Sequence, residues 1–154
     1  MSRYAKDTSV SVSSSQVEIE RIVERYGAEQ FMSGWTNEKA VIGFTMAGRQ
    51  IRFILTMPSK DEPMFHKTPT GKPRAEAAAL KEWEQACRAS WRALALVIKA
   101  KLEAVESGIS MFEDEFMANI VMPNGRTVGD EVRPLIATAY ESGNMPALLP
   151  DYTS

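Results

Sequence analysis

The sequence predicts a single α+β domain over its 154 residues, on two main observations. Three short apolar segments between residues 29 and 57 alternate with a period near two, which is typical of neighbouring strands. The stretch from Arg74 to Ser107 contains no glycine or proline and is rich in alanine, which favours one long helix, or two joined with little interruption. A chain of this length can bury a sizeable core.

The sheet-rich half, residues 8–57, is expected to form a β-α-β-β-β layer with an antiparallel sheet. Residues 8–12 (TSVSV) alternate and predict the first strand. The helix that follows is expected to begin with a capping box of Ser15 and Glu18 and to end at Gly27. The other strands are expected at residues 29–35, 39–46 and 49–57, the last two joined by a tight hairpin turn.

The helical half, residues 74–150, is expected to follow a long loop at residues 58–73. Four prolines and the absence of periodicity between residues 58 and 74 predict this loop. After the long helix, the chain is expected to form one or two shorter helices and a C-terminal tail that lies against the body. The expected elements are a helix merging into a strand at 110–122, a turn at 123–126 and a helix at 127–143.

Composition narrows the classes of function. Hydrophobic residues make up 44% of the chain, but no apolar run is long enough to span a bilayer, so we expect no membrane association. The first residues lack the apolar segment of a secretory signal, so the cytoplasm is the expected location. With Cys87 as the only cysteine and His66 as the only histidine, zinc sites, disulfides and a Ser/His/Asp triad are disfavoured. We expect no enzyme activity, no metal site and no cofactor.

Charge is unevenly distributed along the chain. Residues 1–48 carry five Lys/Arg and six Asp/Glu (net −1), residues 49–101 carry eleven and five (net +6), and residues 102–154 carry two and nine (net −7). This asymmetry predicts a basic face and an acidic face. The basic segment could hold phosphates, and the acidic segment could repel them or pair with the basic one.

Cations form a line along the long helix, beside its apolar stripe. On a helical wheel the cations of this line fall within about 20° of Lys81, on either side of it. They could follow a nucleic-acid backbone, or they could flank the apolar seam with their methylenes packed and their charges in water. The candidate binding residues are these four cations and three that could extend the line: Lys81, Arg88, Arg92 and Lys99, with Lys72, Arg74 and Arg52. The apolar stripe consists of Leu80, Trp83, Cys87, Trp91, Leu94, Ile98, Leu102 and Val105.

Other motifs are less specific. Trp83 and Trp91 are typical of core residues, although a partly exposed one could stack on a base. Residues 69–74 (PTGKPR) contain Gly-Lys but lack the other positions of a phosphate-binding P-loop, so they indicate a connector or a basic contact loop. Residues 112–116 (FEDEF) could bind Mg²⁺, but acids at a helix start are favoured by the helix dipole.

Several stretches together resemble a family of small proteins of tailed bacteriophages and prophages. They span nearly the whole chain: TSVSV (8–12), EIER (18–21), RYGA (25–28), Trp35, GRQIRF (48–53), PTGKPR (69–74), WRALALVIKAKLEAVESG (91–108), PNGRTVG (123–129) and MPALLP (145–150). The resemblance implies a phage protein in the cytoplasm of a bacterial host. It implies no mechanism and no functional residues.

Small phage proteins without catalytic motifs commonly handle DNA or block a host protein. We therefore expect a non-enzymatic accessory protein that binds nucleic acid in replication or recombination, with the basic line as its site. The alternative is an inhibitor of a host defence or nucleic-acid-processing protein, acting through the acidic C-terminal third or the 58–74 segment. The alanine-rich helix also makes a homodimer plausible, because such helices can pack against their symmetry mates.

Overall fold

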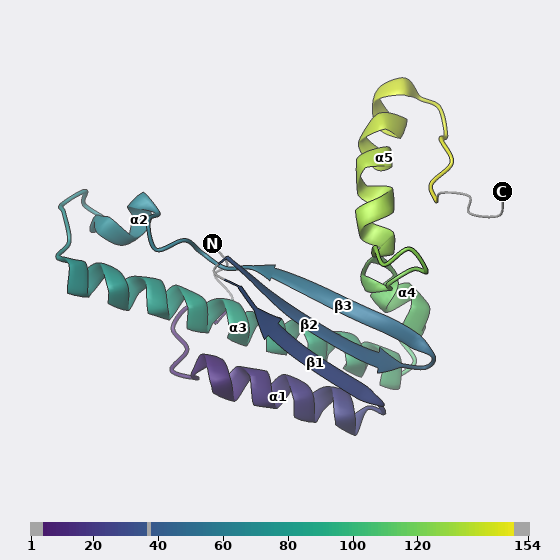
Figure 1. Ribbon diagram of the computed structural model, residues 1–154, viewed down its shortest axis with the longest axis horizontal. Helices are drawn as coiled ribbons and strands as arrows, with labels where there is room; N and C mark the ends of the chain where they lie inside the picture. Colours follow the sequence, from purple (N-terminus) through teal and green to yellow (C-terminus); the bar gives the residue numbers. More distant parts are fainter. Residues whose placement is uncertain (1–4, 37, 150–154) are drawn as a thin grey trace.

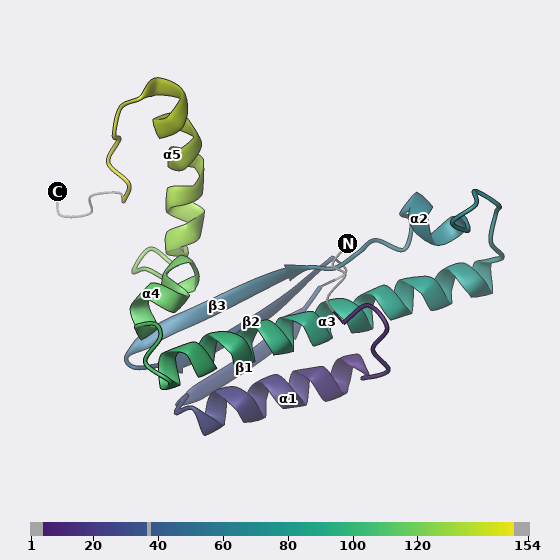
Figure 2. The same ribbon diagram turned by 180° about the vertical axis from the view of Figure 1, so that it is seen from behind.

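The computed structural model describes residues 5–36 and 38–149 and confirms an α+β fold with a three-stranded antiparallel sheet. The strand order is β1-β2-β3, with β1 at Gln30–Trp35, β2 at Lys39–Met46 and β3 at Arg49–Thr56. Helices α1 (Val12–Arg25) and α3 (Glu76–Glu106) cover one face of this sheet, which lies in front of α3 in Figure 1 and behind it in Figure 2.

The strand expected at residues 8–12 does not form, so the order is α-β-β-β. Ser11 instead caps α1, because its hydroxyl accepts a hydrogen bond from the backbone N–H of Ser14 at 3.1 Å. Ser15, the expected cap, lies inside the helix and is fully buried. The serines that resembled the polar half of a strand therefore serve a helix start. Gly27 follows the last turn with φ +104°, as the sequence predicted.

The three strands match the predicted segments within one residue at each end. Ala47 and Gly48 join β2 to β3 with φ of +52° and +72°, the left-handed values that a tight two-residue hairpin needs. The register pairs Ile42 with Phe53 and Phe44 with Ile51, so these four buried side chains share one face of the sheet. They form the centre of the core.

Helix α3 is continuous over 31 residues, and its C-terminal half packs on the sheet. Trp91, Ile98 and Leu102 of the predicted apolar stripe are at most 2% exposed and belong to the core. Leu80, expected in the same stripe, is 44% exposed. The N-terminal half of α3 instead buries the small side chains of Ala79, Ala86 and Ala89, on another side of the helix.

The segment expected as a loop before α3 contains a short helix, α2 (Pro63–His66). An isolated bridge pairs Lys67 with Pro73, and α2 folds back on α3 with Phe65 only 2% exposed. Pro63 stands at the helix start, where its missing N–H costs nothing. Four prolines therefore shape a folded segment here instead of an open connector.

The C-terminal region closes one end of the sheet. A short helix α4 (Phe112–Phe116) and a 3₁₀ turn η1 (Met117–Asn119) follow α3, and an isolated bridge then pairs Ile120 with Ile51 of β3. Phe116 is completely buried, with its ring edge-on to Phe44 and Phe53 at centroid distances of 6.0 and 6.3 Å. The predicted turn at 123–126 forms, with a hydrogen bond from Gly125 N–H to the carbonyl of Met122.

Helix α5 (Val128–Ser142) projects away from the two layers (Figures 1 and 2). Its first turn is held by a capping box between Thr127 and Asp130, and it ends at Gly143 as predicted. The tail does not lie against the body as expected: Met145 is 80% exposed and Leu149 45%. Residues 150–154 of the predicted tail lie outside the described part of the chain.

Replacing Phe116 with alanine is expected to lower the free energy of unfolding by about 3–5 kcal/mol, because it leaves a cavity between the sheet and α4. Urea denaturation followed by circular dichroism measures this change. Ile109→Ala is the control, since Ile109 is 84% exposed and its loss should change stability by about 0.5 kcal/mol or less. Equal effects of the two substitutions would contradict the placement of Phe116.

The Asp130 anchor of α5 is expected to make stability depend on acid pH. Hydrogen bonds from Thr127, and then the nearby Arg126 and Arg133, lower the pKa of Asp130 below its ordinary 3.8. Its stabilising contribution is thus full above that value and is lost as the pH falls through the lower folded-state pKa. Asp130→Asn should be less stable than the parent protein at pH 7. The difference should shrink in unfolding curves measured at progressively lower pH, and a gap independent of pH would contradict this role.

Candidate functional site

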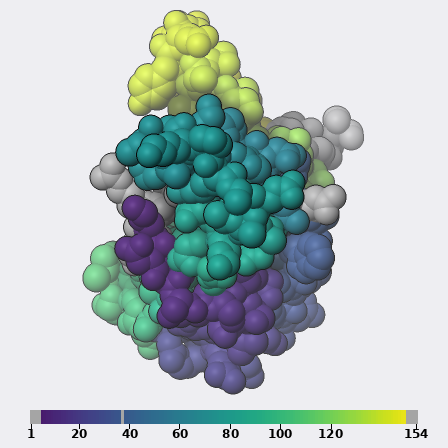
Figure 3. Space-filling view, turned by 90° about the vertical axis from the view of Figure 1, so that its left-hand side faces the viewer, coloured from purple at the N-terminus to yellow at the C-terminus, as the bar shows by residue number. Residues whose placement is uncertain are grey.

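Two hollows flank the first half of α3 at one end of the molecule, which we call the α2 end. It comprises residues 58–74, residues 76–91 of α3 and the strand ends at Trp35 and Met57. Figure 3 faces this end, with the teal residues 58–90 in the centre and the yellow α5 standing clear above them. The basic segment of the sequence supplies most of this surface.

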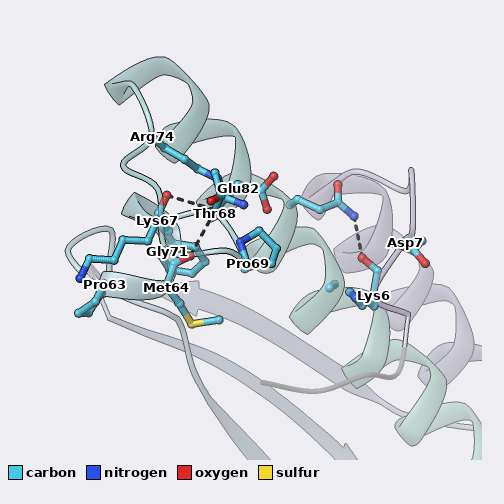
Figure 4. Close-up of a pocket in the computed structure, with 14 residues that line it drawn as sticks. Lys6, Asp7, Pro63, Met64, Lys67, Thr68, Pro69, Gly71, Arg74 and Glu82 are labelled. Atoms are coloured by element: carbon cyan, nitrogen blue, oxygen red, sulfur yellow. Dashed lines mark hydrogen bonds between the residues drawn. The ribbon is translucent and has the colours of Figure 1, made fainter.

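The first hollow has a volume of about 720 Å³ and lies between the α2 segment and α3 (Figure 4). Lys6, Lys67 and Arg74 bring positive charge to it, and Asp7 and Glu82 bring negative charge. The Arg74 guanidinium donates to the carbonyl oxygen of Met64 at 3.3 Å and, at 3.5 Å, to that of the next residue. Arg74, a candidate binding residue, therefore holds the α2 segment in its folded form.

The second hollow, of about 860 Å³, is lined by all three tryptophans of the chain, so we call it the tryptophan hollow. Trp91 is 2% exposed and belongs to the core. Trp83 is half-buried, donates its indole N–H to the carbonyl of Pro58 at 2.7 Å and lies 4.6 Å beneath the Lys60 ammonium. Trp35, at the end of the edge strand β1, is 75% exposed.

Of the three tryptophans that line the hollow, Trp35 is therefore the one whose ring is accessible to a ligand. The sequence did not predict it as a binding residue. The helical pattern of residues 74–107 drew in only Trp83 and Trp91, because Trp35 lies at the end of a strand far away in the sequence. A large aromatic residue as the last residue of an edge strand was the available signal, since no further strand pairs beyond it.

In the predicted line of cations on α3, the arginines bond to other side chains of the protein and the lysines form no ion pair among the described residues. The Arg92 guanidinium forms an ion pair and hydrogen bond with Glu18 of α1. Arg88 donates two hydrogen bonds to the side-chain oxygen of Gln85, at 3.0 and 2.6 Å. The amide of Gln85 in turn donates to the carbonyls of Lys6 and Thr8. These contacts place α1 and the segment before it along the cationic flank of α3.

The lysines among the candidate binding residues are exposed to solvent. Lys72, Lys81 and Lys99 are exposed, and within residues 5–36 and 38–149 no carboxylate lies within 4 Å of their ammonium groups. Lys60 and Lys67 share this condition at the α2 end. Arg52, in contrast, donates to the carbonyl of Gly125 at 2.9 Å and lies 3.9 Å from a carboxylate oxygen of α5.

The acidic third of the chain pairs with the basic segment, one of the two outcomes that the charge asymmetry allowed. Arg49 pairs with Glu113 at 3.2 Å, and Lys101 pairs with Glu115 at 3.4 Å. Arg52 makes the third such contact, with Asp130. Two acids of the FEDEF motif are thus ion-pair partners. The described residues contain no group of three or more His, Cys, Asp or Glu arranged to hold a metal ion.

The single histidine and the single cysteine of the chain both make contacts typical of structural residues. His66, the last residue of α2, is exposed, and its Nε2 lies 2.9 Å from the carbonyl oxygen of Lys60. Cys87 is 7% exposed on the wall of the tryptophan hollow, and burial, with a smaller effect of Glu84, raises the pKa of its thiol. A thiol with a raised pKa is a poor nucleophile at neutral pH.

No protein-family model, curated protein or solved structure matches this chain. Among its described helices, none combines the length and the apolar character needed to cross a membrane. A functional proposal must therefore come from the side chains of the site.

Cys87 is expected to react slowly with a thiol-specific aromatic disulfide reagent at neutral pH and rapidly once urea unfolds the protein. Absorbance of the released thiolate measures both rates. Ser9→Cys supplies an exposed comparison thiol in the same protein and should react at once in the native state. Fast native labelling of Cys87 itself would show that the tryptophan hollow opens to reagents.

Proposed function

We propose that the protein is a non-enzymatic phage accessory protein that binds nucleic acid in replication or recombination, with the α2 end as its contact surface. One observation carries the proposal. Exposed lysines without carboxylate partners, among the residues that the structure describes, lie at the same end of the molecule as the exposed Trp35 ring. Lys60 lines the tryptophan hollow with Trp35, Glu38 and Asp61, and Lys67 lines the first hollow. Ammonium groups that no carboxylate pairs with are available for phosphates, although that of Lys60 also lies over the Trp83 ring, and an exposed indole is available for a base.

The same combination favours single strands over duplexes. In a duplex the base faces are covered by stacking, so Trp35 could meet only the backbone or base edges. In a single strand, bases stack on exposed aromatic rings, and each such contact is worth about 1–3 kcal/mol. The lysines would follow the backbone on either substrate. The proposal therefore assigns phosphate contacts to Lys60, Lys67, Lys72 and Lys81 and base stacking to Trp35.

The remaining candidates have a lesser part in this proposal. Arg52, Arg74 and Arg92 are engaged by carbonyl or carboxylate oxygens of their own chain. Arg88 is bonded to Gln85, although part of its guanidinium is free to bond elsewhere. Lys99 is open but lies on the half of α3 that packs on the sheet, away from the tryptophan hollow.

The alternative, an inhibitor of a host protein that uses the acidic third, has weaker support. Glu113, Glu115, Asp130 and Glu131 each form an ion pair with a cation of the same chain. An acidic surface that imitates nucleic acid needs carboxylates that are free to meet the partner's cations. The 58–74 segment remains exposed and is shared by both proposals.

The proposal predicts salt-dependent binding to a short labelled single strand that is weaker in Lys72→Ala/Lys81→Ala. Removing two phosphate contacts should lower the slope of log affinity against log salt by about 1.4. Fluorescence anisotropy at several salt concentrations measures both quantities. Trp35→Ala should weaken single-strand binding by about 1–3 kcal/mol and duplex binding much less.

Arg21→Ala/Arg25→Ala is the matched control. It removes the same charge from exposed residues of α1 that form no ion pair among the described residues. Equal losses in the two double variants would reject the α2 end as the site. If the parent protein binds neither single nor double strands at low salt, the function itself is rejected, and a stoichiometric partner recovered from host lysate would support the inhibitor.

A further inference from the structure

Helix α5 carries apolar side chains that its own chain does not cover. Ile136 is 48% exposed and Tyr140 88%, and the tail beyond the helix adds Met145 at 80%. Gly129, in the first turn, is the only buried residue of α5. Among the described elements, η1 is the one with which α5 packs most.

A helix of this kind is only marginally stable in water without a surface to pack on. Helices of up to about 15 residues are marginal in water, and α5 has 15 residues. Pro134 lies in its interior, where it removes a backbone hydrogen bond at a cost of about 3 kcal/mol. The carbonyl of Asp130, which would have accepted that bond, accepts one from the Arg126 guanidinium at 3.2 Å instead. The helix start is therefore well anchored, and the rest of α5 needs packing from elsewhere.

The sheet has an uncovered face that suits such a helix. Opposite the core face, Met32 of β1 is 59% exposed and Ile54 of β3 is 52% exposed, with Val41 of β2 half-buried between the two edge strands. An eight-residue strand spans about 26 Å and a 15-residue helix about 22 Å, so the two surfaces match in length. In this structure α5 points away from this face of its own sheet (Figures 1 and 2).

Charge also matches between the two surfaces. The strand residues on the uncovered face include no carboxylate, since strands β1 to β3 contain no Asp or Glu. Of the cations there, Arg52 already bonds to Gly125 and Asp130 of its own chain, and Lys39 forms no ion pair among the described residues. Residues 128–154 contain four acids and one arginine. Of these acids, Glu141 is exposed near the far end of α5. One chain thus carries an uncovered helix and an uncovered sheet face of complementary character.

We propose that the protein is a homodimer in which α5 of each copy packs on the uncovered sheet face of the other. A two-fold axis lets both contacts form at once, because each copy supplies one helix and one sheet face. This arrangement differs from a dimer through the alanine-rich surface of α3, and it adds a third layer to each sheet. The α2 ends of both copies stay accessible.

Sedimentation equilibrium of the full chain tests the proposal. The parent protein is expected at twice the chain mass of 17.1 kDa, and Ile136→Asp/Tyr140→Asp at the mass of one chain. Ile54→Asp, on the sheet face, should have the same effect. All three residues are exposed within one chain, so circular dichroism should show that the sheet and helices α1 and α3 still fold, with a loss of helical signal no greater than that of α5.

Two controls separate this dimer from other associations. Ile109→Asp places the same charge at an exposed residue outside both surfaces and should leave the dimer intact. Val97→Asp, at an exposed residue of α3, should also leave it intact. A parent protein that stays monomeric as its concentration rises would overturn the proposal. So would a dimer that Val97→Asp dissociates and Ile54→Asp does not.

Pairing of charges gives a second readout. Lys39→Glu and Glu141→Lys should each weaken the dimer, and the double variant should regain part of the lost affinity. Additive losses in the double variant, or an unchanged dimer in both single variants, would oppose a contact between the far end of α5 and Lys39 of the other copy.

Discussion

The packing of α3 on the sheet is the contact on which the rest of the structure depends. The sheet has three strands and buries one face, so it needs a long apolar surface to be stable in water. Trp91, Ile98 and Leu102 provide that surface, and α1 adds Ile19, Ile22 and Val23 beside it. Because α3 extends well beyond the sheet, its first half is free to carry the α2 segment. The candidate site thus exists because the helix is longer than the core requires.

Ion pairs then attach the C-terminal region to this two-layer body. Three of them join the basic segment of the chain to the acidic one, which explains how a chain with such uneven charge stays compact. At the α2 end, Arg74 and Arg88 likewise donate hydrogen bonds to oxygen atoms of their own chain. What remains positive at the α2 end is mostly lysine, a flexible point charge that suits the tracking of a backbone more than bidentate recognition of a particular group.

Much of the fold could be predicted from the sequence, because local signals agreed with the final structure. The hairpin at Ala47 and Gly48, the uninterrupted α3 and the end of α5 at Gly143 each follow from the conformational preferences of a few residues. The strand at 8–12 failed because alternation of serine and valine fits a helix cap equally well. The prediction for the α2 segment failed because its fold depends on packing against α3, and the prediction for the tail failed because its apolar residues remain exposed up to Leu149.

The candidate site was less predictable for the same reason. A helical wheel placed Lys81, Arg88, Arg92 and Lys99 on one line, and they do lie on one flank of α3. The wheel contains no information about what lies beside that flank, so it could not show that Glu18 of α1 meets Arg92. The wheel also could not show that Trp35, at the end of a strand, lines the same hollow as residues of α3.

The gathering of all three tryptophans around one hollow has a consequence for spectroscopy. Their indoles sit in three environments: exposed for Trp35, half-buried and hydrogen-bonded for Trp83, and buried for Trp91. Helix α5 contains no tryptophan, so its aromatic signal comes from Tyr140 alone. Excitation at the red edge of the absorption band, which selects indole over phenol, therefore reports on one end of the molecule and is blind to the other. Tryptophan emission can therefore follow events at the tryptophan hollow without a contribution from α5 and without any added dye.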